Sequence, residues 1–239
     1  MLFLLVATTL KSQQDPPKDS TLDWFDRQVG LENTALYHGV IYKETYRTIN
    51  EKIKFYKSSS WQNGSLIYSG QVFTDIPMRY DVFGDQLLIK LKDEMGGGSL
   101  QLFKGKVASF TLIDAVFVNV KEMSEASESS GFYELLWEND KMRLLAKHQK
   151  KDFLRKDRSS LYHEFIDKNK KYLLKYAGKY TLIAKKKDIS ALFPEFKKEV
   201  DDFYQKNKKL GSRDMDAFLT ALINRIEDLL LQNQANSSS

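Results

Sequence analysis

The segment GFYELLWENDKMRLLAK, residues 131–147, holds two apolar runs separated by a short polar turn. Residues 132–138 and 142–147 are each of β-strand length and rich in aliphatic and aromatic side chains. Asn139 and Asp140 lie between them, and both residue types are common in tight turns because their side chains hydrogen-bond the nearby backbone. The segment therefore predicts a β-hairpin, and the same pattern recurs on both sides of it.

Similar apolar runs, with turn residues between them, extend from about residue 36 to residue 184. Asn63 and Gly64 predict a type I′ turn before the run 66–68, because both central positions of that turn need positive φ. Further turns are predicted at Gly84-Asp85, at Gly96–Gly98 and at Ala177-Gly178. Consecutive hairpins without long helices between them favour an antiparallel β-meander, because parallel strands need long crossover connections. So many strands are expected to form a curved sheet or an open barrel.

The C-terminal segment changes from strand periodicity to helical periodicity. Apolar residues spaced three and four apart predict helices over about 188–210 and 213–231, with Gly211 ending the first. Such a helical hairpin must bury its apolar stripe, most simply against the open face or end of the sheet. We therefore predict a mainly β (α+β) fold, in which one β-rich domain over 36–231 is closed by the helical hairpin. Residues 232–239 are expected to form a flexible tail.

The N-terminal segment is expected to direct export. Residues 1–10 are almost wholly apolar and are followed by Lys11, and ten residues are too few to span a bilayer as a helix. A signal segment over 1–12 is therefore predicted, followed by a polar linker or N-terminal extension over 13–35. A buried N-terminal strand or helix is the alternative interpretation. The expected location is the periplasm or the outer envelope, without a transmembrane span.

The composition is that of a globular protein and excludes several kinds of site. Hydrophobic residues make up 42% and charged residues 29% of the 239 residues. The absence of cysteine excludes disulfides, thiolate zinc sites and thiol nucleophiles. No nucleophile elbow, P-loop or dinucleotide fingerprint is present. We expect a protein that is not an enzyme and that needs neither a cofactor nor a metal.

Two groups of residues have both a chemical and a structural interpretation. Asp75, Asp81 and Asp85 could bring carboxylates together for calcium binding or acid–base chemistry, but Asp81 and Asp85 flank a predicted turn, and we favour turn chemistry. His148 and His163 lie in a basic stretch without a nucleophile at motif spacing. A solvated or stacking role is expected for both histidines.

The strongest functional signal is an uneven distribution of charge. Residues 141–210 contain 21 Lys/Arg and nine Asp/Glu, a net charge of +12, whereas the whole chain has a net charge of +5. Such a stretch can bind anionic lipid headgroups or acidic glycans, and a solvated face that aids solubility is the alternative. Nucleic acid is not expected as a partner, because the chain is predicted to be exported. The predicted basic binding face consists of Lys147, Lys150, Lys151, Arg155, Lys156, Arg158, Lys170 and Lys171.

Two other features bear on partners. Lys168 and Lys185–Lys187 continue the basic stretch beyond the residues assigned to the basic binding face. Trp24 and Phe25 precede the first predicted strand and form an aromatic pair that could dock a partner.

A pattern between residues 61 and 88 resembles a family of uncharacterised exported β-rich proteins from Bacteroidetes-type bacteria. In that family a Trp–Gly–Tyr–Gly hairpin leads into an (Ile/Val)-Pro-x-x-Tyr-Asp strand. The matching residues here are Trp61, Gly64, Tyr68, Gly70, Phe73, Ile76, Pro77, Tyr80, Asp81, Asp85, Leu87 and Leu88. The likeness extends to residues 131–136, 144–147 and 188–209, and it covers about residues 36–225. It implies export to the periplasm or outer envelope and no particular activity.

These observations favour a non-enzymatic, exported cell-envelope protein that binds or scaffolds through its basic face. It would act alone or as a subunit of a membrane-attached assembly, and its partner would be an envelope protein or an anionic envelope polymer or lipid. The alternative is a ligand carrier or hydrolase with a site inside the curved sheet, lined by Tyr80, Asp81 or Asp85.

Overall fold

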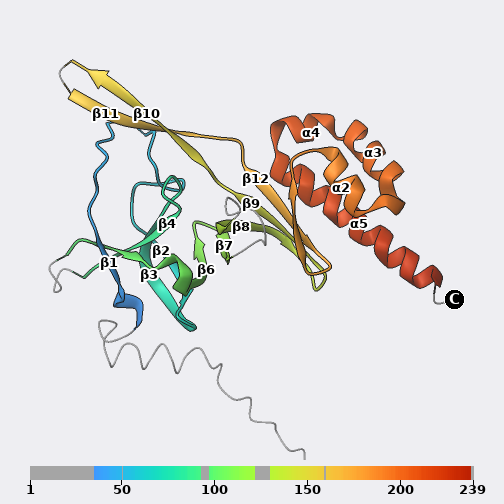
Figure 1. The fold of residues 1–239 in the computed structure, drawn as a ribbon, viewed down its shortest axis with the longest axis horizontal. Helices are drawn as coiled ribbons and strands as arrows, with labels where there is room; N and C mark the ends of the chain where they lie inside the picture. Colours follow the sequence, from blue (N-terminus) through green and yellow to red (C-terminus); the bar gives the residue numbers. More distant parts are fainter. Residues whose placement is uncertain (1–34, 50, 93–96, 122–129, 159, 238–239) are drawn as a thin grey trace, which may run out of the picture.

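The structure is a computed structural model that describes residues 35–49, 51–92, 97–121, 130–158 and 160–237. It is mainly β, with one large antiparallel sheet, a separate two-stranded hairpin and a C-terminal group of helices (Figure 1). The prediction of a mainly β fold with a curved antiparallel sheet is confirmed.

Eleven strands form the large sheet. They are β1 (Gly39–Tyr42), β2 (Gln62–Tyr68), β3 (Gln71–Asp81), β4 (Gln86–Lys90), β5 (Ser99–Leu102), β6 (Val107–Leu112), β7 (Ala115–Val120), β8 (Gly131–Glu138), β9 (Met142–Lys147), β12 (Lys171–Tyr176) and β13 (Lys179–Ile183). Their order is β1-β5-β4-β3-β2-β6-β7-β8-β9-β12-β13, and the pairings are antiparallel. The sheet thus consists of two meanders that meet where β2 pairs with β6.

The connection from β5 to β6 requires the sheet to curve. Three strands lie between β5 and β6, so in a flat sheet the two would be about 19 Å apart. The five peptide steps from Leu102 to Val107 reach at most about 18 Å, and the chain must also return along the strand direction. The sheet therefore curls at this end, and it does so without closing.

Aromatic side chains fill the core of the curled part. Phe110 on β6 stacks on Phe117 on β7 with ring centroids 4.8 Å apart. The ring of Tyr80 packs against both of them and against Phe132 of β8, at centroid distances of 5.1 to 5.8 Å. Tyr80 is only 1% exposed. The space inside the curl is thus occupied by packed rings.

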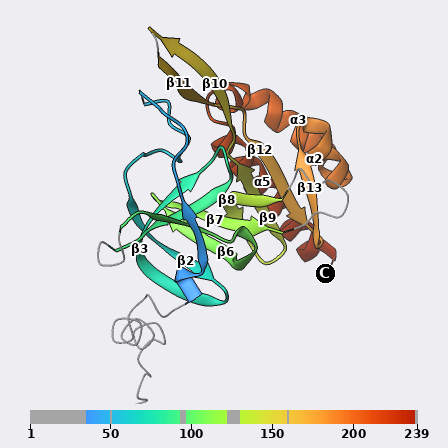
Figure 2. The same ribbon diagram turned by 60° about the vertical axis from the view of Figure 1, so that its left-hand side comes forward.

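A second core lies between the other half of the sheet and the helices. The helices are α2 (Lys186–Leu192), α3 (Lys197–Lys206), α4 (Lys208–Arg213) and α5 (Met215–Ser237) (Figures 1 and 2). Their buried side chains, such as Val200, Phe218 and Leu222, pack with Leu144 of β9 and Leu174 of β12. No helix in the described part of the chain is both long enough and apolar enough to cross a bilayer.

The predicted turns at Gly84-Asp85, Asn139-Asp140 and Ala177-Gly178 are confirmed, Gly96 of the turn predicted at Gly96–Gly98 lies outside the described residues, and the turn predicted at Asn63 and Gly64 is wrong. Both residues lie inside β2, where Gly64 pairs with Ile76 of β3. The turn that joins β2 to β3 is Ser69-Gly70, and both of its residues have positive φ, as a type I′ turn requires. Gly64 is needed for another reason, because a Cβ there would overlap the carbonyl oxygen of Thr111 on β6.

The expected first helix is divided by a proline. Phe193 has non-helical backbone angles, as is typical of a residue before proline, and the 3₁₀ helix η6 (Pro194–Phe196) separates α2 from α3. Gly211 lies inside α4 and packs against Phe218, so it does not end a helix. The last helix, α5, continues through Ser237, so residues 232–237 are helical where a tail was expected.

No strands are predicted between residues 150 and 167, yet β10 (Lys150–Asp157) and β11 (Ser160–Asp167) form a hairpin there. It projects from the body of the molecule in both views (Figures 1 and 2). Its base is held by Phe165 N–H, which donates to the Lys52 carbonyl at 2.8 Å. The Phe165 ring is buried against Tyr46 and Phe83, at centroid distances of 5.3 and 5.0 Å. The segment was not predicted as strands because its many charged residues obscure the pattern typical of a strand.

Candidate functional site

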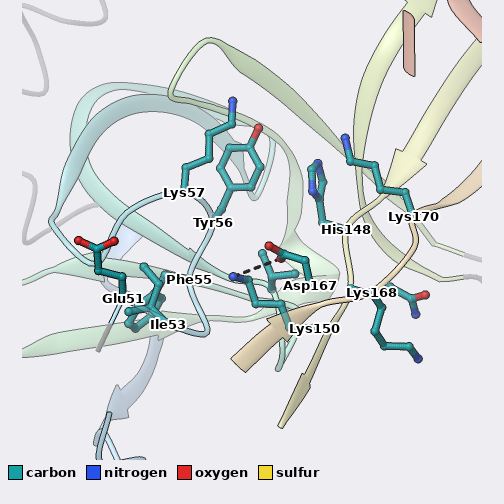
Figure 3. Close-up of a pocket in the computed structure, with 12 residues that line it drawn as sticks. Glu51, Ile53, Phe55, Tyr56, Lys57, His148, Lys150, Asp167, Lys168 and Lys170 are labelled. Atoms are coloured by element: carbon teal, nitrogen blue, oxygen red, sulfur yellow. Dashed lines mark ion pairs between the residues drawn. The ribbon is translucent and has the colours of Figure 1, made fainter. Parts of the chain in front are cut away.

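A pocket of about 470 Å³ lies at the base of the hairpin β10–β11 (Figure 3). Connecting segments line most of it: residues 51–57 between β1 and β2, 148–149 between β9 and β10, and 168–170 between β11 and β12, with Lys150 and Asp167 at the adjoining strand ends. Connections of this kind carry binding residues in many proteins, because a rigid sheet positions them. We call this hollow the hairpin pocket.

Lys57, the first cation of the hairpin pocket, lies in a strained turn. Lys57 has φ of 53°, and Ser58 N–H donates to the Tyr56 carbonyl at 2.5 Å, which makes a γ-turn centred on Lys57. A γ-turn with positive φ is rare and costs free energy for a residue other than glycine. The Lys57 and Tyr56 side chains point the same way at the pocket rim (Figure 3), with Lys57 Nζ 5.0 Å from the Tyr56 ring centroid. Such strain is found preferentially at binding sites.

Glu134 of β8 does not line the hairpin pocket but holds two residues that do, His148 and Lys170. Its Oε2 lies 2.6 Å from His148 Nε2 and 3.5 Å from Lys170 Nζ. Burial raises the pKa of Glu134, but the hydrogen bond with His148 and the charge of Lys170 outweigh it, and the pKa is lowered. Lys170 also pairs with Asp216 of α5, which accepts a 2.7 Å hydrogen bond from Tyr172. Lys170 is thus held in place by carboxylates from a strand and a helix.

Tyr56 adds a neutral donor to the pocket. Burial, with a smaller effect from the nearby Glu134 carboxylate, raises the pKa of Tyr56 to about 12. The phenol therefore keeps its proton at neutral pH. The His148 ring meets the Tyr56 ring edge-on at 4.9 Å, which orients both.

Four lysines and two carboxylates line the hairpin pocket: Lys57, Lys150, Lys168 and Lys170, with Glu51 and Asp167. Lys150 pairs with Asp167 at 3.3 Å, the ion pair drawn in Figure 3. Lys57 and Lys168 are exposed, and neither forms an ion pair with any residue in the described ranges. Lys57 and Lys168 project in different directions from the two ends of the pocket (Figure 3), so they add positive charge around it and do not converge on one anionic group. The described residues include no cluster of three His, Asp or Glu side chains arranged to hold a metal ion.

A second pocket of about 700 Å³ adjoins the first and shares Lys170 with it. It lies between β12–β13 and the helices, and we call it the helix pocket. Tyr204 and Leu219 contribute apolar surface to it. The remaining cations of its lining are Lys171, Lys185, Lys186 and Arg213. Basic side chains therefore line two hollows that meet at Lys170.

The structure separates the residues of the predicted basic binding face into three groups. Lys150 and Lys170 line the hairpin pocket, and Lys170 and Lys171 line the helix pocket. The second group is exposed along the hairpin, from Lys151 near its base to Arg155, Lys156 and Arg158 in its outer half. The third group is Lys147 alone.

Lys147 does not belong to a binding face. Its side chain is only 11% exposed, with Nζ 3.0 Å from Asp85 Oδ2 and 2.6 Å from the Ser130 carbonyl. Lys104 approaches the same Asp85 oxygen at 3.0 Å, and Tyr80 O–H donates to the other carboxylate oxygen at 2.8 Å. Burial raises the pKa of Asp85, but the two lysines outweigh it and the pKa is lowered. Lys147 therefore joins β9 to the β3–β4 turn as a structural residue.

The structure favours the turn interpretation of the aspartates. Asp81 Oδ1 accepts the Gly84 N–H at 2.9 Å, and Oδ2 pairs with the buried Lys54 at 3.1 Å. Asp75 accepts a 2.7 Å hydrogen bond from Asn63. Each of the three carboxylates has its own partner, so they do not converge on a common ligand.

Both histidines stack on aromatic rings, as expected. The rings of His163 and Tyr46 meet edge-on at 4.9 Å, and His163 Nδ1 lies 2.9 Å from Asp152. Trp24 and Phe25 lie outside the described residues. Lys57 and Tyr56 were not predicted as site residues, because no local sequence signal indicates the γ-turn that presents them.

Comparisons of the chain with protein-family models, with curated proteins and with solved structures found no match. The resemblance to exported β-rich proteins stays a prediction.

Proposed function

We propose that this chain is a non-enzymatic binding protein of the cell envelope that holds an anionic envelope polymer across the hairpin pocket and the helix pocket. The main support for the proposal is that Lys170 lines both the hairpin pocket and the helix pocket, and that other cations line each of them. A small anion needs one such hollow, whereas a linear polyanion can place successive charged groups in both. The assignment to the envelope depends on the predicted signal segment over 1–12.

The electrostatics of the two pockets support binding more than catalysis. Glu134 and Asp216 hold Lys170 in position, so its ammonium group is already oriented before a ligand arrives. Exposed lysines such as Lys57 and Lys168 add long-range attraction, which salt screens. The interior site of the alternative hypothesis is not favoured, because the residues assigned to it, Tyr80, Asp81 and Asp85, are engaged in packing, ion pairs and a turn.

The test is a binding titration with two labelled polyanions, polygalacturonate as a polycarboxylate and polyphosphate. We expect affinity for at least one of them to fall as salt is raised. Lys57→Glu/Lys168→Glu in the hairpin pocket and Lys185→Glu/Arg213→Glu in the helix pocket should each weaken binding by roughly tenfold or more.

Lys90→Glu/Lys106→Glu is the matched control, because both lysines are exposed in the other half of the sheet and the double replacement changes the net charge by the same amount. A wild-type chain that binds neither polymer at low salt would refute the proposal. An equal loss of affinity in the Lys90→Glu/Lys106→Glu variant would refute the assignment to the two pockets, because it would indicate a response to net charge alone.

A further inference from the structure

The hairpin β10–β11 has a base and a tip of different character. At the base, Phe165 is buried against the body, and three carboxylates, Asp152, Glu164 and Asp167, have basic or histidine partners. Seven residue steps separate Lys150 from Asp157, so the strands reach about 23 Å from base to tip. The tip projects away from the sheet and the helices (Figures 1 and 2).

One face of the hairpin carries exposed aliphatic side chains after it leaves the body. Leu154 lies opposite His163, and Lys156 lies opposite Leu161. Because side chains alternate along a strand, Leu154 and Leu161 share the face of the buried Phe165 and are diagonal neighbours on it. Their exposed fractions are 58% and 56%. A two-stranded ribbon has no core of its own to cover them.

Cations surround the two exposed leucines. In the outer half of the hairpin, Arg155, Lys156 and Arg158 outnumber the single carboxylate of Asp157. Arg155 pairs with Glu164 at 3.3 Å but remains half exposed. Lys156 projects from the same face as the leucines, directly opposite Leu161. The tip therefore combines aliphatic side chains with an excess of positive charge at one end of a projecting arm.

This combination fits the surface of an anionic lipid bilayer. Cations gain from the negative surface potential of the headgroups, and aliphatic side chains gain from reaching the boundary with the acyl chains. A polyanion in water would attract the cations but would leave both leucines in water.

We propose that the tip of the hairpin β10–β11 docks on a bilayer that contains anionic lipid, with Leu154 and Leu161 at the headgroup–acyl boundary and Arg155, Lys156 and Arg158 against the headgroups. This inference deepens the proposed function by adding a membrane surface to it. The docking residues are distinct from those that line the two pockets, so each proposal can fail without the other.

The experiment measures co-sedimentation of the full chain with vesicles of phosphatidylcholine, with or without about a third of phosphatidylglycerol. The wild type should bind the anionic vesicles and bind the neutral ones far less. Leu154→Ser/Leu161→Ser and Lys156→Glu/Arg158→Glu should each lower the affinity by roughly tenfold or more. Leu231→Ser is the matched control, since Leu231 on α5 is 56% exposed, and it should bind as the wild type does.

A second measurement covers the case in which a hairpin variant misfolds. The chain has no cysteine, so Leu161→Cys carries an environment-sensitive fluorophore at one site. Its emission should shift to the blue with anionic vesicles and remain unchanged with polygalacturonate. The absence of wild-type vesicle binding, unchanged binding after Leu154→Ser/Leu161→Ser, or no emission shift would overturn the inference. Polymer binding by the same leucine variant tests the proposed function separately and should be unaffected.

Discussion

Replacement of Lys147 by methionine separates its structural role from a role in binding. The side chain is buried on β9, and its ammonium group contacts Asp85 and the Ser130 carbonyl. Methionine has a similar length and no charge, so Lys147→Met leaves the Asp85 carboxylate and the Ser130 carbonyl without this donor. We expect the variant to lose stability and to keep the anion affinity of the folded protein.

The size of the loss follows from the local ion pairs. Removing one partner of a buried ion pair costs about 3–5 kcal/mol. Lys104 still lies 3.0 Å from the same Asp85 oxygen, so the lower end of that range applies, about 3 kcal/mol. For a chain of this size each kcal/mol shifts the melting temperature by about 2–4 °C, which gives a decrease of about 6–12 °C.

The assay is thermal unfolding followed by circular dichroism, combined with polygalacturonate binding at a temperature where the variant is folded. Lys151→Met is the control, because Lys151 also belongs to the predicted basic binding face but is exposed on β10. Its melting temperature should change by less than about 2 °C. If Lys147→Met melts with the wild type and binds the polymer more weakly, the reasoning about Lys147 is refuted.

Two further predictions concern packing and pH. Gly64→Ala should lower the melting temperature by at least about 4 °C, because the added Cβ would overlap the Thr111 carbonyl. Gly105→Ala is the control and should leave the melting temperature unchanged, because nothing lies within 4 Å of a Cβ there. Equal melting temperatures of the two variants would contradict this prediction. The pKa values of Asp85 and Glu134 are lowered below their ordinary 3.8 and 4.5, so the unfolded chain takes up protons first as the pH falls. The stability that these two carboxylates contribute should be complete above about pH 4.5 and should decrease at lower pH. Urea unfolding at several pH values measures this decrease. A free energy of unfolding that stays constant below about pH 4.5 would contradict the prediction.

Local signals in the sequence were sufficient for much of the fold. The turns at Asn139-Asp140 and Gly84-Asp85 follow from residue types that hydrogen-bond their own backbone or tolerate unusual angles. Gly64 shows the limit of this reasoning. A glycine accommodates either a turn or a close approach by a neighbouring strand, and the sequence does not distinguish the two.

The candidate site was only partly predictable, because the sequence shows local features and not which distant segments meet. The charge excess over residues 141–210 indicated Lys150 and Lys170, because charge density is visible along the chain. Lys57 lies more than ninety positions before Lys150, and only the tertiary fold brings the two to one pocket.

The sequence by itself determined most of the antiparallel hairpins, the apolar helix faces and the uneven distribution of charge, because these depend on neighbouring residues. The tertiary structure alone decided which lysines are buried and which are exposed. Lys147 and Asp85 are 62 positions apart and meet only because β9 is brought beside the β3–β4 turn, which converts an apparent surface cation into a structural one. The exposure of Leu154 and Leu161 at the hairpin tip was also decided by the tertiary structure, because it depends on where the body of the protein ends.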